Sequence, residues 1–160
     1  MAKELFITQW LSKEMLLAGE NLIKRLDECD AKVQAAFWLL DGEENVWKLT
    51  IVSPLVESEG PRNYYRRINN VNDTADSEED VVSLHDIHVA NTDNRIFKAM
   101  LSFKDTALWK TMPLINTRLG KNFIGGVYFE DMYLYRIESE LVGSNIPGTA
   151  TENANYSPSP

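Results

Sequence analysis

The stretch VQAAFWLLDGEENVWKLTIVSP, residues 33–54, decides the fold of this chain. Its second apolar run alternates Trp47, Leu49 and Ile51 with polar residues, which is the two-residue period of a half-buried strand. Its first run is apolar on both faces, which is typical of a strand inside a sheet. Between the two runs stands DGEEN, a turn-forming segment with one glycine and three acidic residues. The stretch therefore predicts a β-hairpin with a short loop.

Helices are predicted both before and after this hairpin in the sequence. Residues 3–28 repeat apolar side chains at spacings of three and four, which is the pattern of an amphipathic helix. A second helix is expected to begin at Gly60-Pro61, because proline is tolerated in the first helical turn. A third is expected to run through RIFKAMLSF, with Asn91 or Thr92 capping its start.

Three further strands are predicted after the hairpin. In residues 81–90 the alternation slips at His85-Asp86, which a β-bulge at that point would explain. Residues 114–119 and 123–137 are also strand-like, with a turn at 120–122 between them. Glu130-Asp131 indicates either a second tight turn or the exposed middle of one long strand. The paired glycines Gly125-Gly126 indicate a bulge or a close backbone approach.

The resulting order, α-β-β-α-β-α-β-β, predicts an α+β fold with a mostly antiparallel sheet and helices packed mainly on one face. A chain of 160 residues fits one domain, which is expected over residues 1–142. Residues 143–160 hold two glycines and three prolines among small polar residues, and they are predicted to form a disordered polar tail. The predicted core comprises Phe37, Leu39, Leu49, Ile51, Val127 and Phe129.

Charge and composition limit the classes of partner that the chain can bind and the compartment in which it is expected. With 24 acidic and 16 basic residues it has a formal charge of −8, which repels nucleic acid and anionic membranes. The single cysteine, Cys29, excludes an internal disulfide and a cysteine-rich metal site. No stretch approaches the roughly 20 apolar residues of a membrane span, and the first residues lack the apolar run of a signal peptide. A cytoplasmic protein is expected, with no cofactor, no metal ion and no membrane partner.

Several segments resemble a family of small bacterial proteins of unassigned function. They are QAAFWLLDGEENVWKLTIVSPLVESEGPRNYYRRI, SLHDIHVANTDNRIFKAM and FIGGVYFEDMYLYRI, and the resemblance covers residues 3–137. It implies a bacterial, cytosolic, single-domain α+β protein. It includes no catalytic signature, and so it transfers no site residues to this chain.

The cluster His85, Asp86 and His88 is the main candidate for chemistry. Two histidines beside a carboxylate have the groups for metal binding or proton transfer. In a regular strand, however, residues 85 and 88 point to opposite faces, and only a bulge would bring them together. The alternative is that both histidines are structural or face solvent.

A basic and aromatic cluster in the predicted second helix is a candidate for contact with an anion or a partner. It consists of Arg62, Tyr65, Arg66 and Arg67. Arginines at i and i+4 lie on one helix face, and tyrosines can stack on bases. The alternative is a solvated helix face whose charge is balanced by the acidic run in residues 73–80.

Three apolar residues of the first predicted helix fall outside its buried stripe: Phe6, Trp10 and Leu17. A symmetric homodimer would bury such a surface, because one patch then serves both subunits. Alternatively, these side chains wrap into the core beneath the loop at residues 106–113, near Trp109 and Met112.

The best-supported function is a non-enzymatic protein-interaction or self-associating module, because the sequence holds no catalytic motif. The alternative is a small-ligand-binding or hydrolytic enzyme with a site near His85, Asp86, His88 and the helix that carries Arg62 and Arg67. A nucleic-acid-binding accessory protein is the third hypothesis, which the negative charge disfavours. The first two differ in one structural test, namely whether His85, Asp86 and an arginine share a cleft.

Overall fold

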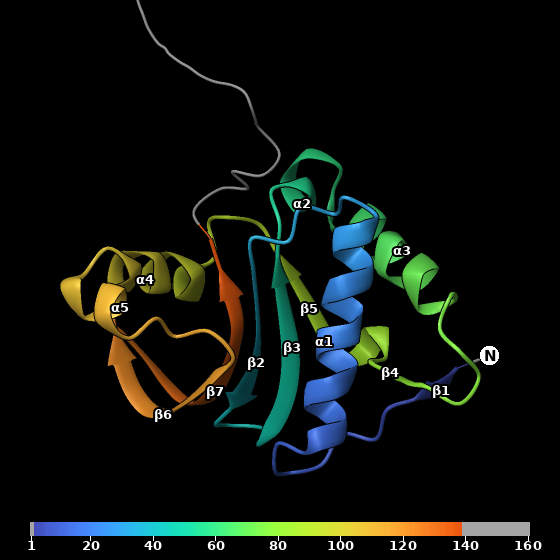
Figure 1. Cartoon of the computed structure of the whole chain (residues 1–160), viewed down its shortest axis with the longest axis horizontal. Helices are drawn as coiled ribbons and strands as arrows, with labels where there is room; N and C mark the ends of the chain where they lie inside the picture. The colour runs from blue at the N-terminus through green and yellow to red at the C-terminus, as the bar shows by residue number, and fades with distance from the viewer. Residues whose placement is uncertain (1, 139–160) are drawn as a thin grey trace, which may run out of the picture.

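The computed structural model describes residues 2–138, and the tail expected at 143–160 lies outside the described residues. A five-stranded sheet in the order β5-β3-β2-β7-β6 forms the centre of the molecule (Figure 1). Of the four strand pairs in this sheet, three are antiparallel and β3–β5 is parallel. The predicted α+β class and the mostly antiparallel sheet are therefore confirmed. The strands are β2 (Ala35–Asp41), β3 (Val46–Val52), β5 (Ile87–Ala90), β6 (Thr117–Ile124) and β7 (Val127–Ile137).

The predicted hairpin is present as β2 and β3, paired from Ala35 opposite Val52 to Asp41 opposite Val46. The Asp41 carboxylate closes the turn by accepting hydrogen bonds from the backbone N–H groups of Glu43 and Glu44, at 2.8 and 3.1 Å. Strand β2 lies between β3 and β7 in the middle of the sheet. This position explains why its residues are apolar on both faces.

Helices cover both faces of the sheet, in contrast to the single face that was expected. Ala36 and Trp38 of β2 pack with α1 and α3, whereas Ala35 and Phe37 pack with α4. Figure 1 shows α1 lying along β3 while α4 and α5 lie at the opposite end, near β6. A central strand with apolar residues in both phases needs cover on both sides. The helices are α1 (Lys13–Glu28), α2 (Leu55–Ser58), α3 (Pro61–Asn72), α4 (Arg95–Lys104) and α5 (Ala107–Thr111).

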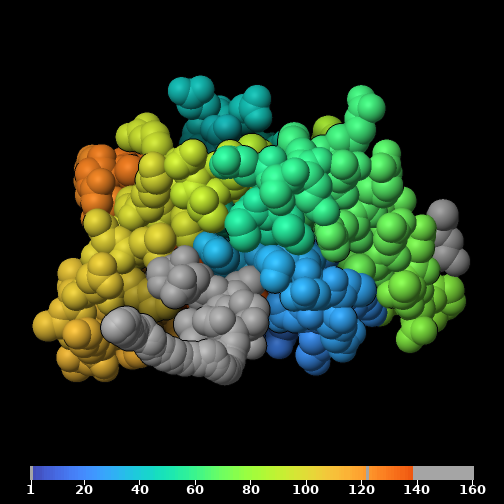
Figure 2. All heavy atoms as spheres, turned by 90° about the horizontal axis from the view of Figure 1, so that it is seen from above, coloured from blue at the N-terminus to red at the C-terminus, as the bar shows by residue number. Residues whose placement is uncertain are grey.

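Figure 2 shows the molecule from above, with α1, α3 and the α4–α5 layer in the same view. The blue surface of α1 adjoins the green surface of α3, and the yellow residues of α4 and α5 lie at the other end of the molecule. Helix α3 begins at Pro61, directly after Gly60 with its positive φ of 91°, as the sequence predicted. No helix among the described residues is both long and apolar enough to cross a lipid bilayer.

The first helix is ten residues shorter than predicted. It begins at Lys13, because the Ser12 hydroxyl accepts a hydrogen bond from Met15 N–H at 3.2 Å and caps the helix there. The preceding residues 2–11, called the arm below, are not helical. Within the arm, β1 (Lys3–Glu4) pairs in parallel with β4 (Asp80–Val81). Phe6 and Trp10 therefore belong to an irregular segment and not to a helix face.

The expected β-bulge at His85-Asp86 is absent. A 3₁₀ turn, η1 (Leu84–Asp86), takes its place, and the Ser83 hydroxyl accepts a hydrogen bond from His85 N–H at 3.2 Å. The alternation slips at this point because β4 and β5 belong to two different sheets. A single strand with a bulge was the wrong interpretation of residues 81–90.

The last hairpin turns at Gly125-Gly126 and not at residues 120–122. Both glycines have positive φ, 58° and 81°, which suits a tight turn between two antiparallel strands. A Cβ at Gly125 would lie 2.9 Å from Ala99 Cα, so the expected close backbone approach is also present. Strand β7 runs without interruption through Glu130-Asp131, which settles the alternative left open above.

Two smaller predictions are corrected by local contacts. Helix α4 is capped by Asn94, whose side-chain oxygen accepts a hydrogen bond from Phe97 N–H at 2.9 Å, whereas Asn91 forms a turn just before it. In the core, Leu39 and Val127 are only half-buried, because they stand near the ends of their strands. The other predicted core residues are fully buried: Phe37, Leu49, Ile51 and Phe129.

Candidate functional site

Two of the predicted site residues, His85 and Asp86, line an open cleft of about 500 Å³, called the arm cleft below. One wall is the arm at Ile7, Thr8 and Gln9. The opposite wall is the β2–β3 turn and the first residues of β3. The cleft therefore joins three segments that lie far apart in the sequence. The residues of the second wall are Glu44, Asn45, Val46, Trp47 and Lys48.

Backbone and side-chain hydrogen bonds hold the arm in this position. The Leu5 N–H donates to the Val81 carbonyl at 2.8 Å, and the Leu5 side chain is buried in the core on the α1 side. Farther along, the indole N–H of Trp47 donates to the Gln9 carbonyl at 3.0 Å. Because Trp47 is itself fully buried, this bond attaches the arm wall to the rigid part of the sheet.

The charged groups of the arm cleft are of both signs. Partial burial raises the pKa of the Asp86 carboxyl above its ordinary value, although the nearby charges of His85 and Lys48 oppose that rise. Lys48 projects from the exposed phase of β3, and Glu44 stands in the turn. An adjacent acid, histidine and lysine at a cleft wall can hold a small polar ligand or form ion pairs with a protein surface.

The third member of the predicted cluster, His88, is not among the residues that line the arm cleft. It lies in β5 opposite Thr50 of β3, and burial together with the Lys48 charge lowers the pKa of its imidazole. Within residues 2–138 no group of three or more His, Cys, Asp or Glu side chains is arranged to hold a metal ion. The three predicted residues are therefore divided between two elements.

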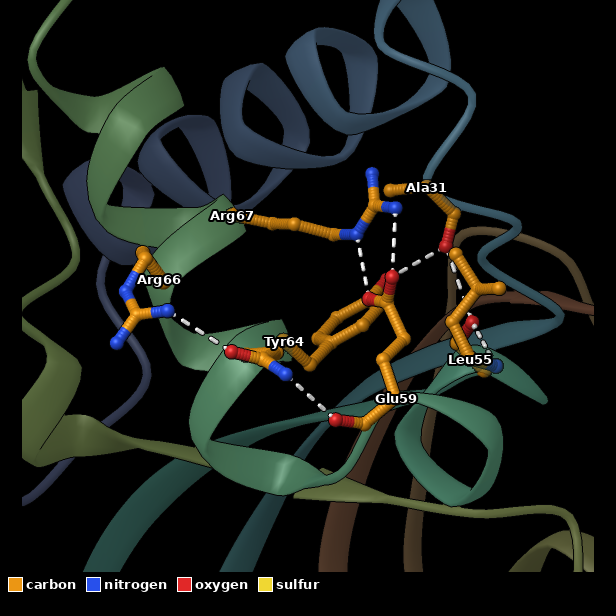
Figure 3. A network of polar contacts seen from close by, with 8 residues as sticks. Ala31, Leu55, Glu59, Tyr64, Arg66 and Arg67 are labelled. Atoms are coloured by element: carbon orange, nitrogen blue, oxygen red, sulfur yellow. Dashed lines mark hydrogen bonds and ion pairs between the residues drawn. The ribbon is translucent and has the colours of Figure 1, made fainter.

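The arginines of α3 do not reach the arm cleft. Figure 3 shows Arg67 directed at Glu59, with N–O distances of 2.6 and 2.9 Å, and Arg66 donating to the Asn63 side chain at 2.9 Å. The hydrogen bonds from Arg67 lower the pKa of the Glu59 carboxyl. Arg62, at the exposed start of the helix, is likewise absent from the cleft lining. The proposed convergence of His85, Asp86 and an arginine is therefore not found, since the cation of this cleft is Lys48.

Tyr65, the aromatic member of the same cluster, has a structural role. Its hydroxyl donates to the Ile87 carbonyl at 3.0 Å and accepts from Val89 N–H at 3.3 Å, so it binds α3 to the edge strand β5. Neighbouring Tyr64 is fully buried and donates to the Ala31 carbonyl at 2.9 Å. Both tyrosines thus use their hydroxyl groups inside the fold.

The three apolar residues singled out beyond the stripe are exposed: Phe6 at 81%, Trp10 at 67% and Leu17 at 58%. Phe6 and Trp10 belong to the arm and Leu17 belongs to α1, and below we call these three side chains together the arm surface. Phe6 and Trp10 stand immediately before and after the three arm residues that line the cleft. The alternative that they wrap into the core near Trp109 is wrong. Trp109 is buried on the opposite face of the sheet, where it packs edge-to-face on Phe103 with ring centroids 5.9 Å apart.

Sequence reasoning missed the parts of the site that come from the hairpin. Lys48 was assigned only to the exposed phase of a strand, and Glu44 only to a turn. Both residues become part of the cleft because the arm passes beside them. The contact between Gln9 and Trp47 joins residues that are 38 positions apart in the sequence. No local pattern in the sequence predicts this contact.

A comparison of the chain with known protein families, curated proteins and solved structures found no match. The resemblance to a bacterial family of unassigned function therefore stays a prediction.

Proposed function

We propose that this protein is a non-enzymatic protein-interaction module that self-associates through its arm surface. The observation that supports this proposal is the exposure of Phe6, Trp10 and Leu17, more than half in each case. Aromatic side chains are enriched in interface cores, and an isolated monomer gains nothing by leaving them in water.

A second copy of the chain is the occupant that the charges favour. Two basic residues, Lys48 and His85, and two acidic residues, Glu44 and Asp86, stand beside the arm surface. A twofold contact can therefore place the basic groups of one copy against the acidic groups of the other. Burying the exposed part of Trp10 removes on the order of 130 Å² from water, which is worth about 3 kcal/mol per copy. Two such contributions give about 6 kcal/mol, whereas a micromolar dimer requires about 8 kcal/mol net of the entropy of association, so the burial of Phe6 and Leu17 must supply the remainder.

Light scattering after size-exclusion chromatography tests the proposal. The wild type is expected to be a dimer at tens of micromolar, and Trp10→Glu is expected to be a monomer with its dissociation constant raised at least a hundredfold. The matched control is Met112→Glu, because Met112 is 63% exposed but follows α5 on a different surface. A wild type that stays monomeric at these concentrations, or a Met112→Glu variant that dissociates equally, overturns the proposal.

A second candidate function is small-ligand binding in the arm cleft. The observation that favours it is that His85, Asp86 and Lys48 line the same cleft of about 500 Å³. Thermal-shift measurements with a panel of small carboxylates and phosphates test it. A stabilising compound whose effect disappears in Lys48→Ala supports this function, and a panel without effect rejects it. The cytoplasmic and bacterial setting stays a prediction that localisation in the native cell would test.

A further inference from the structure

The arm lies in a slot on the body of the protein that is formed by segments far from it in the sequence. The backbone N–H of Leu5 donates to the Val81 carbonyl of β4, and the Leu5 side chain is buried in the cluster under α1 and α3. At the other end of the slot the Trp47 indole donates to the Gln9 carbonyl. We call β4, the core around Leu5 and the Trp47 indole the arm slot. The structure shows directly which sequence this slot binds, namely residues 2–11.

The paired part of the arm is separate from the central sheet. Strands β1 and β4 form a sheet of their own, in which only two residues of each strand are paired. Figure 1 shows this pair beyond α1, away from the central strands. Open hollows flank the arm, one of about 520 Å³ beside Ala2 and Glu4 and the other the arm cleft. Because two short strands add little stability by themselves, the arm can leave its slot while the central sheet stays intact.

A short connection joins the arm to helix α1. Gln9 is held by Trp47, and Ser12 caps α1, so only Trp10 and Leu11 stand between these two fixed points. Three steps along the backbone reach at most about 11 Å. A short hinge between two well-held elements favours the exchange of a segment between identical chains.

We propose that two copies of this chain exchange their arms, so that residues 2–11 of each copy occupy the arm slot of the other. This inference rests on the proposed self-association and specifies how the two copies are joined. Each contact of the arm with its slot is remade between the copies, so new contacts decide the balance between monomer and dimer. The short hinge brings the first turns of the two α1 helices together, where the exposed side chains of Trp10 and Leu17 become buried.

A second copy is favoured over an unrelated peptide as the occupant of the arm slot. The arm is tethered beside its own slot, which gives it a high effective concentration there against any foreign segment. A foreign segment would also leave the displaced arm without a binding site. A second copy instead supplies an arm of the same sequence and accepts the displaced arm in return, so both slots are filled.

A disulfide trap distinguishes exchanged arms from unexchanged arms. Lys3 and Asp80 are direct partners in the β1–β4 register, so cysteines at these two positions lie within reach of a disulfide. The variant Lys3→Cys, Asp80→Cys also carries Cys29→Ser, which removes the native thiol. Its dimer is isolated under reducing conditions, oxidised and run on a denaturing gel without reductant. Exchanged arms link the two chains covalently, which is the expected result, whereas unexchanged arms give single chains with an internal disulfide.

Single-cysteine variants are the matched controls for the trap. They are Lys3→Cys and Asp80→Cys, each combined with Cys29→Ser. Neither is expected to give covalently linked chains, because each cysteine then faces a position without a thiol. Light scattering before oxidation shows that each variant has the same oligomeric state as the wild type.

The rate of dimer dissociation tests the exchange with a different variant. Leu5 must leave the core whenever an arm is released, so Leu5→Ala is expected to speed dissociation of a diluted dimer at least about tenfold. Its dissociation constant is expected to change less than about threefold, because the lost contact is missing from the monomer and the dimer alike. In a dimer with unexchanged arms, dissociation does not require Leu5 to leave the core.

The outcomes separate the exchange from self-association. A dimer whose oxidised chains run singly overturns the exchange and leaves self-association standing. A Leu5→Ala dimer that dissociates at the wild-type rate, or whose dissociation constant rises in step with its rate, also overturns only the exchange. A wild type that is monomeric at tens of micromolar overturns both.

Discussion

The carbonyl oxygen of Ala31 accepts two hydrogen bonds inside the protein. One comes from the Tyr64 hydroxyl at 2.9 Å and the other from the Ser53 hydroxyl at 3.0 Å, and Ser53 Oγ in turn accepts from Leu55 N–H at 3.1 Å (Figure 3). These bonds join the loop at Ala31 and the segment from Ser53 to Leu55 to helix α3, which carries Tyr64. Burial of the Tyr64 ring raises the pKa of the Tyr64 hydroxyl to about 12.

This shift predicts a specific alkaline weakness of the fold. An unfolded tyrosine ionises near pH 10, so below that pH the contribution of Tyr64 is fully present, and it is lost as the pH rises from about 10 to about 12. The loss amounts to about 2–3 kcal/mol. Urea unfolding at pH 9 and pH 11.5 measures it by comparing the wild type with Tyr64→Phe. The wild type is expected to lose more stability than the variant, and equal losses would contradict the assignment.

Helix α1 lies very close to the sheet at Gly19. A Cβ at this position would lie 2.9 Å from the ring carbon Cζ of Tyr135 and 3.1 Å from the Trp38 indole nitrogen. The Tyr135 hydroxyl donates to the Leu16 carbonyl at 2.7 Å and accepts from the Trp38 N–H at 3.0 Å. Burial raises the pKa of this hydroxyl, which therefore stays protonated. The glycine makes room for a hydrogen-bonded junction of helix and sheet.

Gly19→Ala is therefore expected to destabilise the protein, although alanine favours a helix by about 1 kcal/mol over glycine. The added methyl group displaces Tyr135 from both partners, and a net loss of about 1–3 kcal/mol of unfolding free energy is expected. Thermal unfolding by calorimetry measures it. Glu20→Ala, one position on and exposed, serves as the control and should stay within about 0.5 kcal/mol of the wild type. A stabilised Gly19→Ala variant would show that α1 stands farther from β7.

At the scale of the whole molecule, one strand joins two separate hydrophobic clusters. Trp38 of β2 belongs to the cluster under α1 and α3, and adjacent Phe37 belongs to the cluster under α4. The two clusters share no side chain, but they share the backbone of the central strands. We therefore expect the described part of the chain to unfold as one cooperative unit.

Fluorine NMR of protein labelled with 5-fluorotryptophan tests this expectation, because Trp38 and Trp47 report on one cluster and Trp109 on the other. The three signals are expected to lose their native intensity at the same denaturant concentration. Phe37→Ala is expected to lower the unfolding free energy by about 3–5 kcal/mol and to move all three transitions together. An earlier transition for Trp109 alone would indicate that the α4–α5 layer unfolds separately.

By itself the sequence determined the elements whose signals are local. The β2–β3 hairpin follows from alternation and from the turn residues after Asp41, and α3 follows from Gly60-Pro61 and an inner face that includes Tyr64. The surplus of apolar residues at Phe6 and Trp10 was also visible. In each case the physical cause lies within a few residues of its effect, as turn geometry and amphipathic period do.

Only the tertiary structure decided where these elements lie relative to one another. The Ser12 cap ended the predicted long helix, and the pairing of the arm with β4 then placed Gln9 beside Trp47 to form the cleft that holds Asp86. The covering of both sheet faces likewise depends on which distant segments come together. Such contacts are selected by the combined burial of many side chains, and no short stretch of sequence records that sum.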